Sequence, residues 1–410
     1  MDVLAYRVVE IAWQPRTAAQ WSVFTASRLE AACCWNDMVT RHARIRRLGA
    51  RLNNKVKWPT FGRWMRWVKG RYPAMSAQSA QQAVGEFLEA VSSCAKLRRK
   101  QISDGGAAIA RYPWRLHRYR DVTYTNQCVG ARSDLLRLSN GRGNEPLRVK
   151  LPRALPGRIV EVTVAFGVVR VVCEITAPSA APTSVIGVDL GVNTLVAAGD
   201  GERAVLVSGR EAKATIQWRA KNLASISAAQ STLTKGSRRW RRLQRRKHKM
   251  LDKAASRIKD ITHKATRAVT VTFPGATVVV GKPFNDAAQK MGRGQAQQVS
   301  SACNAKIIAQ LAYKMNGARE VDEHYTSQTC PVCGERRRMR RVYRCSGCGF
   351  EAPRDVVGLT NIRSIGLHGE MVFPAEVPKR VVFVRPLRKY PGARLQVVPG
   401  DPRQVARRAA

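Results

Sequence analysis

The sequence predicts an α/β domain joined to a β-rich domain that carries inserted helices. Three observations predict this arrangement. The carboxyl-terminal half alternates apolar strand-like runs with helical stretches, and it opens with a hairpin pattern at residues 184–208. The amino-terminal half places short β-like runs on both sides of two long helical segments. Two CxxC pairs between residues 330 and 348 mark a small metal-binding insertion in the second half.

The amino-terminal half begins with a predicted strand at residues 3–13, which Pro15 ends. Thr17 is a suitable N-cap for a helix from about 18 to 48, whose apolar residues recur near the helical period. A second helix is predicted from 76 to 100, after a linker that includes Trp58-Pro59.

Residues 105–150 are irregular and basic, and residues 147–178 return to a β pattern. Together with the first strand, these runs are expected to close a small barrel into which the two helices are inserted. Prolines at 178 and 182 place a domain boundary near residue 180.

The second half follows the order strand hairpin, helix, strand, helix, strand, helix, which is the order of an RNase H-like domain. The predicted elements are strands at 184–190, 194–198 and 204–208, a basic helical region at 211–268, a strand at 277–280, a helix at 296–316, a strand at 318–324 and a short helix after Asp355. The tail from 367 is rich in proline and arginine and is expected to be disordered.

The chain is strongly basic, with 72 Lys and Arg against 28 Asp and Glu and a formal net charge of +44. Self-repulsion makes such an excess costly, so we expect a large polyanionic partner, and a long nucleic acid fits best. A membrane surface is less suitable, because the charge is spread along the chain and no run of about 18 apolar residues occurs. Residues 1–30 show no signal-peptide core, so we expect a cytoplasmic protein. The family resemblance described below implies a prokaryotic protein that acts at the nucleoid.

The two CxxC pairs predict one structural zinc ion held by four thiolates. Each pair supplies two sulfurs of a tetrahedral site, and a spacing of this kind is typical of a zinc ribbon. The ligands would be Cys330, Cys333, Cys345 and Cys348. In a reducing compartment the six other cysteines are expected to be small core residues.

Two aspartates are candidates for a second, acidic site. Asp189 lies near the end of the apolar run 185–190, where an unpaired carboxylate is costly, so either an arginine or a metal ion should accompany it. Asp355 begins the helix after the ribbon, and it is either a second metal ligand or an ordinary N-cap.

Four ordered segments resemble the TnpB family of transposon-encoded RNA-guided DNA endonucleases, which is ancestral to type V CRISPR effectors. They are IGVDLGVN at 186–193, YTSQTCPVCG at 325–334, YRCSGCG at 343–349 and RDVVGLTNI at 354–362. The resemblance implies an oligonucleotide-binding-like wedge barrel with a helical recognition lobe, followed by a RuvC nuclease domain. The implied boundaries are 1–16 and 140–180 for the wedge, 17–139 for the lobe, 181–325 and 351–366 for RuvC, 326–350 for the zinc ribbon and 367–410 for the tail.

The resemblance also implies the chemistry and the partners. A guide RNA pairs with target double-stranded DNA, and a RuvC site with two magnesium ions, or manganese, cuts it. Asp189 and Asp355 match the first and last carboxylates of that site. The protein would act as a monomer or a homodimer.

One family position departs from the pattern. The glutamate expected at the end of the fourth strand is replaced by Gly281. Either the nuclease is inactive, or a neighbouring strand supplies the acid, as in Fanzor-like relatives that carry it in a Val-Asp-Glu stretch before the ribbon. Glu323 matches that position and is our preferred third ligand; alternatively, it is a surface carboxylate paired with Arg319.

Two basic segments are expected to contact nucleic acid through arginine–phosphate contacts and aromatic stacking. Their candidate residues are Arg111, Tyr112, Trp114, Arg115, Arg118, Tyr119 and Arg120 in the first, and Arg238, Arg239, Arg241, Arg242, Arg245, Arg246 and Lys247 in the second. The loop after Gly281, which contains the glycine-rich segment 291–295, is interpreted as a flexible lid, with a phosphate cradle as the alternative.

The sequence therefore predicts an RNA-guided, magnesium-dependent DNA endonuclease. Two alternatives stay open. One is an RNA-guided DNA-binding repressor without cleavage, and the other is a guide-free RuvC-like nuclease or transposase accessory protein.

Overall fold

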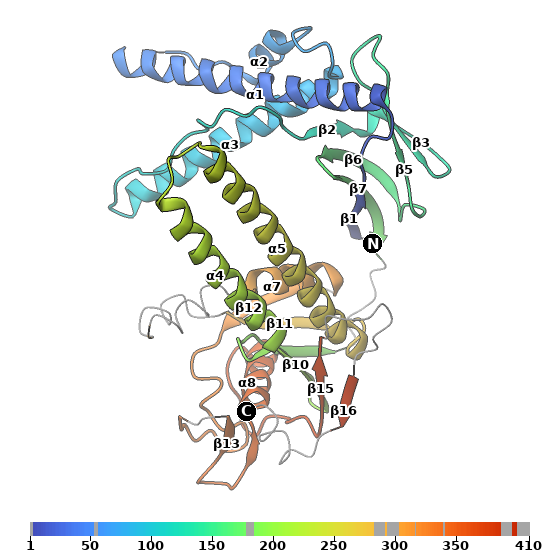
Figure 1. Cartoon of the computed structure of the whole chain (residues 1–410). Helices are drawn as coiled ribbons and strands as arrows, with labels where there is room; N and C mark the ends of the chain where they lie inside the picture. Colours follow the sequence, from blue (N-terminus) through green and yellow to red (C-terminus); the bar gives the residue numbers. More distant parts are fainter. Residues whose placement is uncertain are drawn as a thin grey trace. The chain divides into compact units, whose positions relative to one another are not determined.

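The computed structural model describes residues 3–52, 56–177, 184–282, 303–315, 317–338, 341–386 and 396–399, together with Gly292. The chain divides into two compact units, Met1–Pro178 and Ser179–Ala410 (Figure 1). In the part of the chain so described, no helix combines the length and apolar character needed to cross a membrane.

The first unit contains two antiparallel sheets. The larger has the order β1-β7-β6-β2, and its strands are β1 Val3–Ala12, β2 Val122–Thr125, β6 Arg158–Ala165 and β7 Val168–Ala177. The smaller has the order β3-β4-β5, with β3 Val129–Arg132, β4 Leu135–Leu138 and β5 Leu147–Lys150, and the 3-10 turn Asn126–Cys128 leads into it. Because the pairing gives two sheets, closure into one barrel stays a prediction.

Three helices lie between β1 and β2 in the chain: α1 Ala18–Arg51, α2 Phe61–Val68 and α3 Ala77–Ser103. Each begins at a side-chain cap, since Thr17, Thr60 and Ser76 accept hydrogen bonds from backbone N–H groups three residues later. Their buried apolar faces share one hydrophobic core with the strands of this unit.

The second unit is built on a seven-stranded sheet with the order β12-β11-β8-β9-β10-β15-β16. Its strands are β8 Val185–Asp189, β9 Thr194–Gly199, β10 Arg203–Ser208, β11 Thr277–Lys282, β12 Ala318–Asp322, β15 Arg380–Arg385 and β16 Gln396–Pro399. Strands β8, β9 and β10 form an antiparallel hairpin series, whereas β11 pairs parallel with both β8 and β12. The central strands are apolar on both faces because both faces are covered.

Helices cover the two faces of this sheet. The helices are α4 Arg210–Ser231, α5 Arg238–Thr272, α7 Asn304–Lys314 and α8 Arg354–His368. Residues of α5 and α7 pack into the core on one face, and Val356 and Leu359 of α8 pack against Ala197 and Leu206 on the other. A Cβ added to Gly187 would lie 2.0 Å from the carbonyl oxygen of Leu359, so this glycine lets α8 lie directly on β8.

The zinc-ribbon segment forms its own two-stranded sheet, in which β13 Val342–Arg344 pairs with β14 Glu351–Pro353. Strand β14 leads directly into α8. The ribbon therefore connects β12 to α8.

Three predictions differ from the structure, and a fourth lies largely outside the described residues. The linker predicted through Trp58-Pro59, ahead of the helix at 76, contains α2, whose Trp64 and Val68 are buried. Strands β2, β3 and β4 lie inside the predicted helical lobe 17–139, in the stretch expected to be irregular. The predicted tail begins at 367, but α8 ends at His368, and β15 pairs with β10 with Val384 buried, so disorder is wrong for these residues. The loop at 291–295 and the predicted start of the helix at 296 lie outside the described residues, except for Gly292.

Candidate functional site

Three carboxylates come together at one edge of the central sheet. Asp189 is the last residue of β8, and Glu323 directly follows β12. Because β8, β11 and β12 are parallel neighbours, their carboxyl ends lie on the same edge. Asp355 reaches this edge from the first turn of α8, which packs on β8. This edge is where open α/β sheets place their binding sites.

Asp189 is partly buried and carries the clearest electrostatic signal of the site. Burial raises its pKa to about 7, and the negative charges of Asp355 and Glu323 contribute to this rise. Arg354 opposes the rise, but among the described residues no basic group lies within ion-pair distance of Asp189. The alternative of a structural arginine salt bridge at Asp189 is therefore not what the structure shows.

Asp355 is not the N-cap that an aspartate at a helix start commonly provides. The cap position is Pro353, and it makes no side-chain cap hydrogen bond. The carboxylate of Asp355 instead accepts a hydrogen bond from the hydroxyl of Thr194, the first residue of β9. This bond holds Asp355 toward the sheet edge where Asp189 lies.

Glu323 lies where a side chain at position 281 would begin. A Cβ placed on Gly281 would be 2.8 Å from Oε2 of Glu323 and 3.0 Å from its Cβ. The register explains the overlap, since Gly281 pairs with Val321 on the neighbouring strand and Glu323 is two residues further along. The glycine thus leaves open the space that the glutamate of the next strand fills.

The two acidic residues of β12 are exposed to solvent. Glu320 and Asp322 are exposed, and Asp322 accepts hydrogen bonds from the backbone and the ring of His324. Arg319, the proposed partner for Glu323 in the surface alternative, donates to the carbonyl of Gly366, with 3.0 Å between Nη2 and O. Alternation along β12 therefore separates Glu323 from the two solvent-facing acids.

A fully buried asparagine fastens α8 to the segment that follows Glu323. Nδ2 of Asn361 donates to the carbonyl oxygens of Thr326 at 2.7 Å and Thr329 at 2.8 Å. Thr326 in turn donates from its backbone N–H and its hydroxyl to the carbonyl of Glu323. Asn361 and Thr326 together link the helix that carries Asp355 to the chain that carries Glu323.

Sequence reasoning had not singled out Asn361 or Gly358. A Cβ on Gly358 would lie 2.7 Å from Oδ2 of Asp189, so the glycine makes room for that carboxylate beside α8. Both residues lie within the RDVVGLTNI segment. The polar amide of Asn361 among apolar helix residues is the one sequence feature that could have indicated a structural role.

The four predicted zinc ligands do come together. The sulfur atoms of Cys330, Cys333, Cys345 and Cys348 all lie within 4.8 Å of one another, as the ligands of one ion would. Across the described chain no other three Asp, Glu, His or Cys side chains have ligand atoms this close, so the acidic residues do not form a cage for a single ion.

The two knuckles of the ribbon have matching backbone geometry. Gly334 and Gly349 follow the second cysteine of each pair with φ of 77° and 72°, a conformation that glycine adopts without strain. Their N–H groups donate to the carbonyls of Cys330 and Cys345. This geometry supports a zinc site at the cysteine cluster.

The predicted nucleic-acid residues fall into three groups. On α5, Arg238, Arg239, Arg241, Arg242, Arg245 and Arg246 are exposed and Lys247 is half-buried. In the first unit, Trp114, Arg115, Arg118 and Tyr119 are exposed, while Arg111, Tyr112 and Trp114 line a cavity of about 330 Å³ with Arg46 and Arg98. Arg120 differs, because it forms an ion pair with Glu86 and covers the ring of Trp35, which gives it a structural contact.

Comparison with known families matches two stretches of the chain, the first of which begins in the first unit and continues into the second. Residues 160–282 match the OrfB_IS605 family, described as "Probable transposase", and residues 305–362 match the "Cas12f1-like, TNB domain". The second match spans Glu323, the four cysteines and Asp355.

Two curated proteins are similar over shorter lengths. "Putative RNA-guided DNA endonuclease InsQ" of Escherichia coli K12 is 27% identical over 256 residues, covering 55% of this chain and 62% of the relative. "TnpB-like protein MJ1635" of Methanocaldococcus jannaschii is 28% identical over 128 residues, covering 31% of this chain and 30% of the relative. The matched region thus spans less than two thirds of either relative.

A solved structure of a Cas12f1–sgRNA–target DNA complex shares the fold. It aligns with a TM-score of 0.51 at 9% identity and covers 84% of this chain and 82% of that chain. The two family models and the curated relatives show that this chain is similar to TnpB-type proteins, and the solved structure shows a shared fold.

Proposed function

We propose that this protein is an RNA-guided DNA endonuclease whose RNase H-like, RuvC-type domain cuts target DNA. The observation that carries the proposal is the position of Glu323, whose carboxylate lies in the space that a side chain at Gly281 would enter. Glu323 would then supply the third acid of the site although the expected strand lacks one. The similarity to InsQ supports the reaction class.

The acidic site suits divalent cations. Three carboxylates from separate elements converge without an arginine in ion-pair contact with Asp189. Burial, with a further contribution from the charges of Asp355 and Glu323, raises the pKa of Asp189. Magnesium prefers such oxygen ligands, and we assign Asp189, Glu323 and Asp355 as its ligands. Two magnesium ions, when bound, would activate water and stabilise the leaving oxygen of a phosphodiester.

The chain's own residues orient these ligands. The hydroxyl of Thr194 donates to Asp355, and Gly358 leaves room for Asp189. Asn361 and Thr326 fix α8 relative to Glu323. The exposed arginines of α5 would contact phosphates of a guide RNA or of the target duplex, whose sequence is read mainly by base pairing.

The decisive experiment compares two glutamates only three residues apart. Protein purified with its bound RNA is incubated with magnesium and a matching DNA target, as wild type, Glu323→Gln and Glu320→Gln. Glu323→Gln should abolish cleavage and keep DNA binding, while the exposed Glu320 serves as the matched control. Full cleavage by Glu323→Gln would remove Glu323 from the site, and binding without cleavage by the wild type would favour the repressor alternative.

A positional exchange tests the shared space directly. In the double variant Gly281→Glu with Glu323→Ala, the acid returns to β11, and the tip of the Ile362 side chain, 2.7 Å from the new Cβ, must move aside. We expect cleavage above the level of Glu323→Ala alone. Gly281→Glu without the second change should lower activity, because two glutamates then compete for one space.

The RNA content of the purified protein separates guided from guide-free action. A guided enzyme should retain RNA of one defined sequence, and cleavage should follow the complementarity of that RNA. Cleavage that persists after the RNA is removed with ribonuclease would favour the guide-free nuclease.

A further inference from the structure

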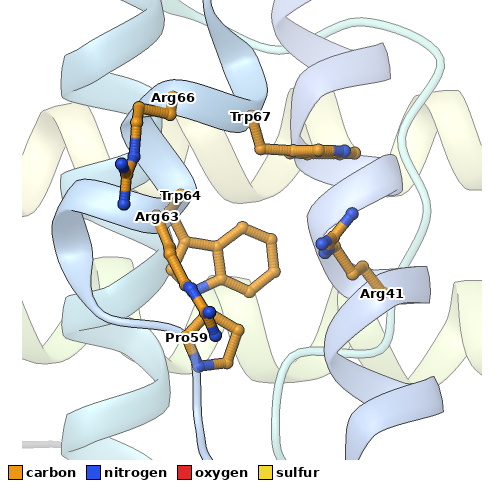
Figure 2. Close-up of a pocket in the computed structure, with 6 residues that line it drawn as sticks. All are labelled: Arg41, Pro59, Arg63, Trp64, Arg66 and Trp67. Atoms are coloured by element: carbon orange, nitrogen blue, oxygen red, sulfur yellow. The ribbon is translucent and has the colours of Figure 1, made fainter.

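The first unit contains a second cavity lined by arginine and tryptophan, in a stretch where the sequence had indicated only a linker. It encloses about 390 Å³ between α1 and α2, and it is lined by Arg41, Pro59, Arg63, Trp64, Arg66 and Trp67. Figure 2 shows Arg41 beside Trp67, and Arg63 and Arg66 near Trp64. The volume lies within the range of about 300–1,000 Å³ that is usual for ligand sites.

The walls of this cavity are held in place by the core of the unit. Trp64 is only 2% exposed and packs edge-on against Phe87 of α3, with 5.8 Å between ring centroids. Thr60 caps α2 by accepting from the N–H of Arg63. The side chain of Arg71 donates to the carbonyl of Trp67 at 2.6 Å, which ties down the end of the helix.

The three arginines of the cavity have no anionic partner within the described chain. None of Arg41, Arg63 and Arg66 forms an ion pair among the described residues. The guanidinium of Arg41 lies 5.9 Å from the centroid of the Trp64 ring and 5.0 Å from that of Trp67. Cation–π contacts orient this guanidinium but leave its charge uncompensated. Three like charges held around one hollow therefore favour binding of an anion.

The ring geometry favours a phosphate over a stacked base. Trp64 and Trp67 meet edge to face, at 83° with 5.8 Å between centroids, so they cannot sandwich a base. Trp64 is buried, and Arg41 and Arg71 both lie over Trp67. What the cavity offers is three exposed arginine side chains along its lining, and guanidinium groups are good donors to phosphate oxygens.

We propose that this cavity binds one phosphodiester group of a nucleic-acid strand, with the adjoining sugar against the half-buried side chain of Trp67. That the anion belongs to a nucleic acid rests on the proposed function, whereas the anion site itself rests on the cavity. The site is separate from the carboxylates in the second unit, and none of its residues was among those predicted from the sequence to bind nucleic acid.

Salt-dependent binding tests the proposal without requiring cleavage. The full chain, freed of RNA, is titrated with a fluorescent single-stranded RNA of about 20 nucleotides at several salt concentrations. Arg63→Gln and Arg66→Gln should each lower affinity roughly tenfold and reduce the salt slope by about 0.7. Arg137→Gln on β4 is the matched control, because Arg137 is also exposed and has no ion pair among the described residues.

Equal losses of RNA affinity in the control and in the cavity variants would overturn the proposal, because the loss would then follow from net charge alone. Loss of binding to poly-glutamate but not to RNA would overturn it in favour of an acidic protein partner. Trp67→Leu should lower affinity without changing the salt slope, because it removes a surface and no charge.

A crosslink gives a direct readout of the position. RNA carrying 5-iodouracil, irradiated on the protein, should label the peptide that contains Trp67, and the label should fall in Arg63→Gln. Absence of that peptide among the crosslinked products would contradict the assignment. Because RNA affinity and crosslinking are measured without cleavage, failure of the cavity site and failure of the nuclease proposal are distinguishable.

Discussion

Replacing Asp189 by asparagine should make the metal-free protein more stable while abolishing cleavage. The pKa of Asp189 rises from 3.8 to about 7, and about 1.4 kcal/mol accompanies each pH unit, so ionising this group in the folded protein costs roughly 4 kcal/mol. Because Asp189 keeps some contact with solvent, we reduce this to about 2 kcal/mol. For a domain of this size that gain corresponds to an increase in Tm of about 4–8 °C.

The sign follows from the direction of the pKa change. A folded-state pKa above the unfolded value means that the folded protein binds the proton more tightly, so this contribution is fully present below pH 3.8 and is lost as pH rises toward about 7. The stabilisation by Asp189→Asn should therefore be complete near about pH 8 and absent near about pH 4.

Thermal unfolding in the presence of a chelator of magnesium that spares zinc measures this difference. Asp252→Asn, at an exposed position on α5, is the matched control and should show no such pH dependence. Added magnesium should raise the Tm of the wild type and not of Asp189→Asn, because only a site with its ligands gains binding energy in the folded state. A destabilised Asp189→Asn at the higher pH, or an equal gain at both pH values, would refute the electrostatic reasoning.

Three further predictions concern the supports of the site. Asn361→Asp should lower the stability of the second unit by about 2–4 kcal/mol, because a carboxylate cannot donate to the carbonyls of Thr326 and Thr329, and urea unfolding would detect the loss; an unchanged midpoint would contradict it. Cys333→Ser should release bound zinc, measured by a colorimetric chelator, and abolish cleavage, because the ribbon connects Glu323 to Asp355; full activity without zinc would show that the ribbon is dispensable. Truncation after Lys379 should lower Tm, because it removes β15 with the buried Val384 and uncovers the edge of β10; an unchanged Tm would mean that β15 contributes nothing to the fold.

Much of the second unit could be predicted from local pattern. The hairpin at β8–β10, the parallel strands β11 and β12, and the helices that alternate with them are confirmed, because buried strands are continuous apolar runs that end at turn residues. The four cysteines were predictable as a cluster because their spacing alone defines the two knuckles. In the first unit, α1 and its cap Thr17 follow from the helical period in the same way.

The missed elements are those whose stability comes from distant partners. Helix α2 has eight residues, too few to be recognised by periodicity, and it forms because Trp64 and Val68 enter the core shared with α3. Strand β15 lies among arginines and prolines that suggest disorder, and it is ordered by pairing with β10, which ends more than 170 residues earlier in the chain. The arginine cavity depends on the same tertiary contacts, so no sequence motif at residues 59–67 predicts it.

The exchange of space between Gly281 and Glu323 has a consequence for how such proteins change during evolution. The two positions lie 42 residues apart in the chain, yet side chains at both would occupy the same space. The role of either residue therefore cannot be inferred from that position alone. A glycine at 281 would suggest a lost site, and a glutamate at 323 would suggest a variable surface residue. An acid can pass from one strand to its neighbour only if the first position shrinks as the second fills. Selection would then act to keep one carboxylate in the shared space. We expect the two positions to covary, with a small residue at one whenever the other is an acid.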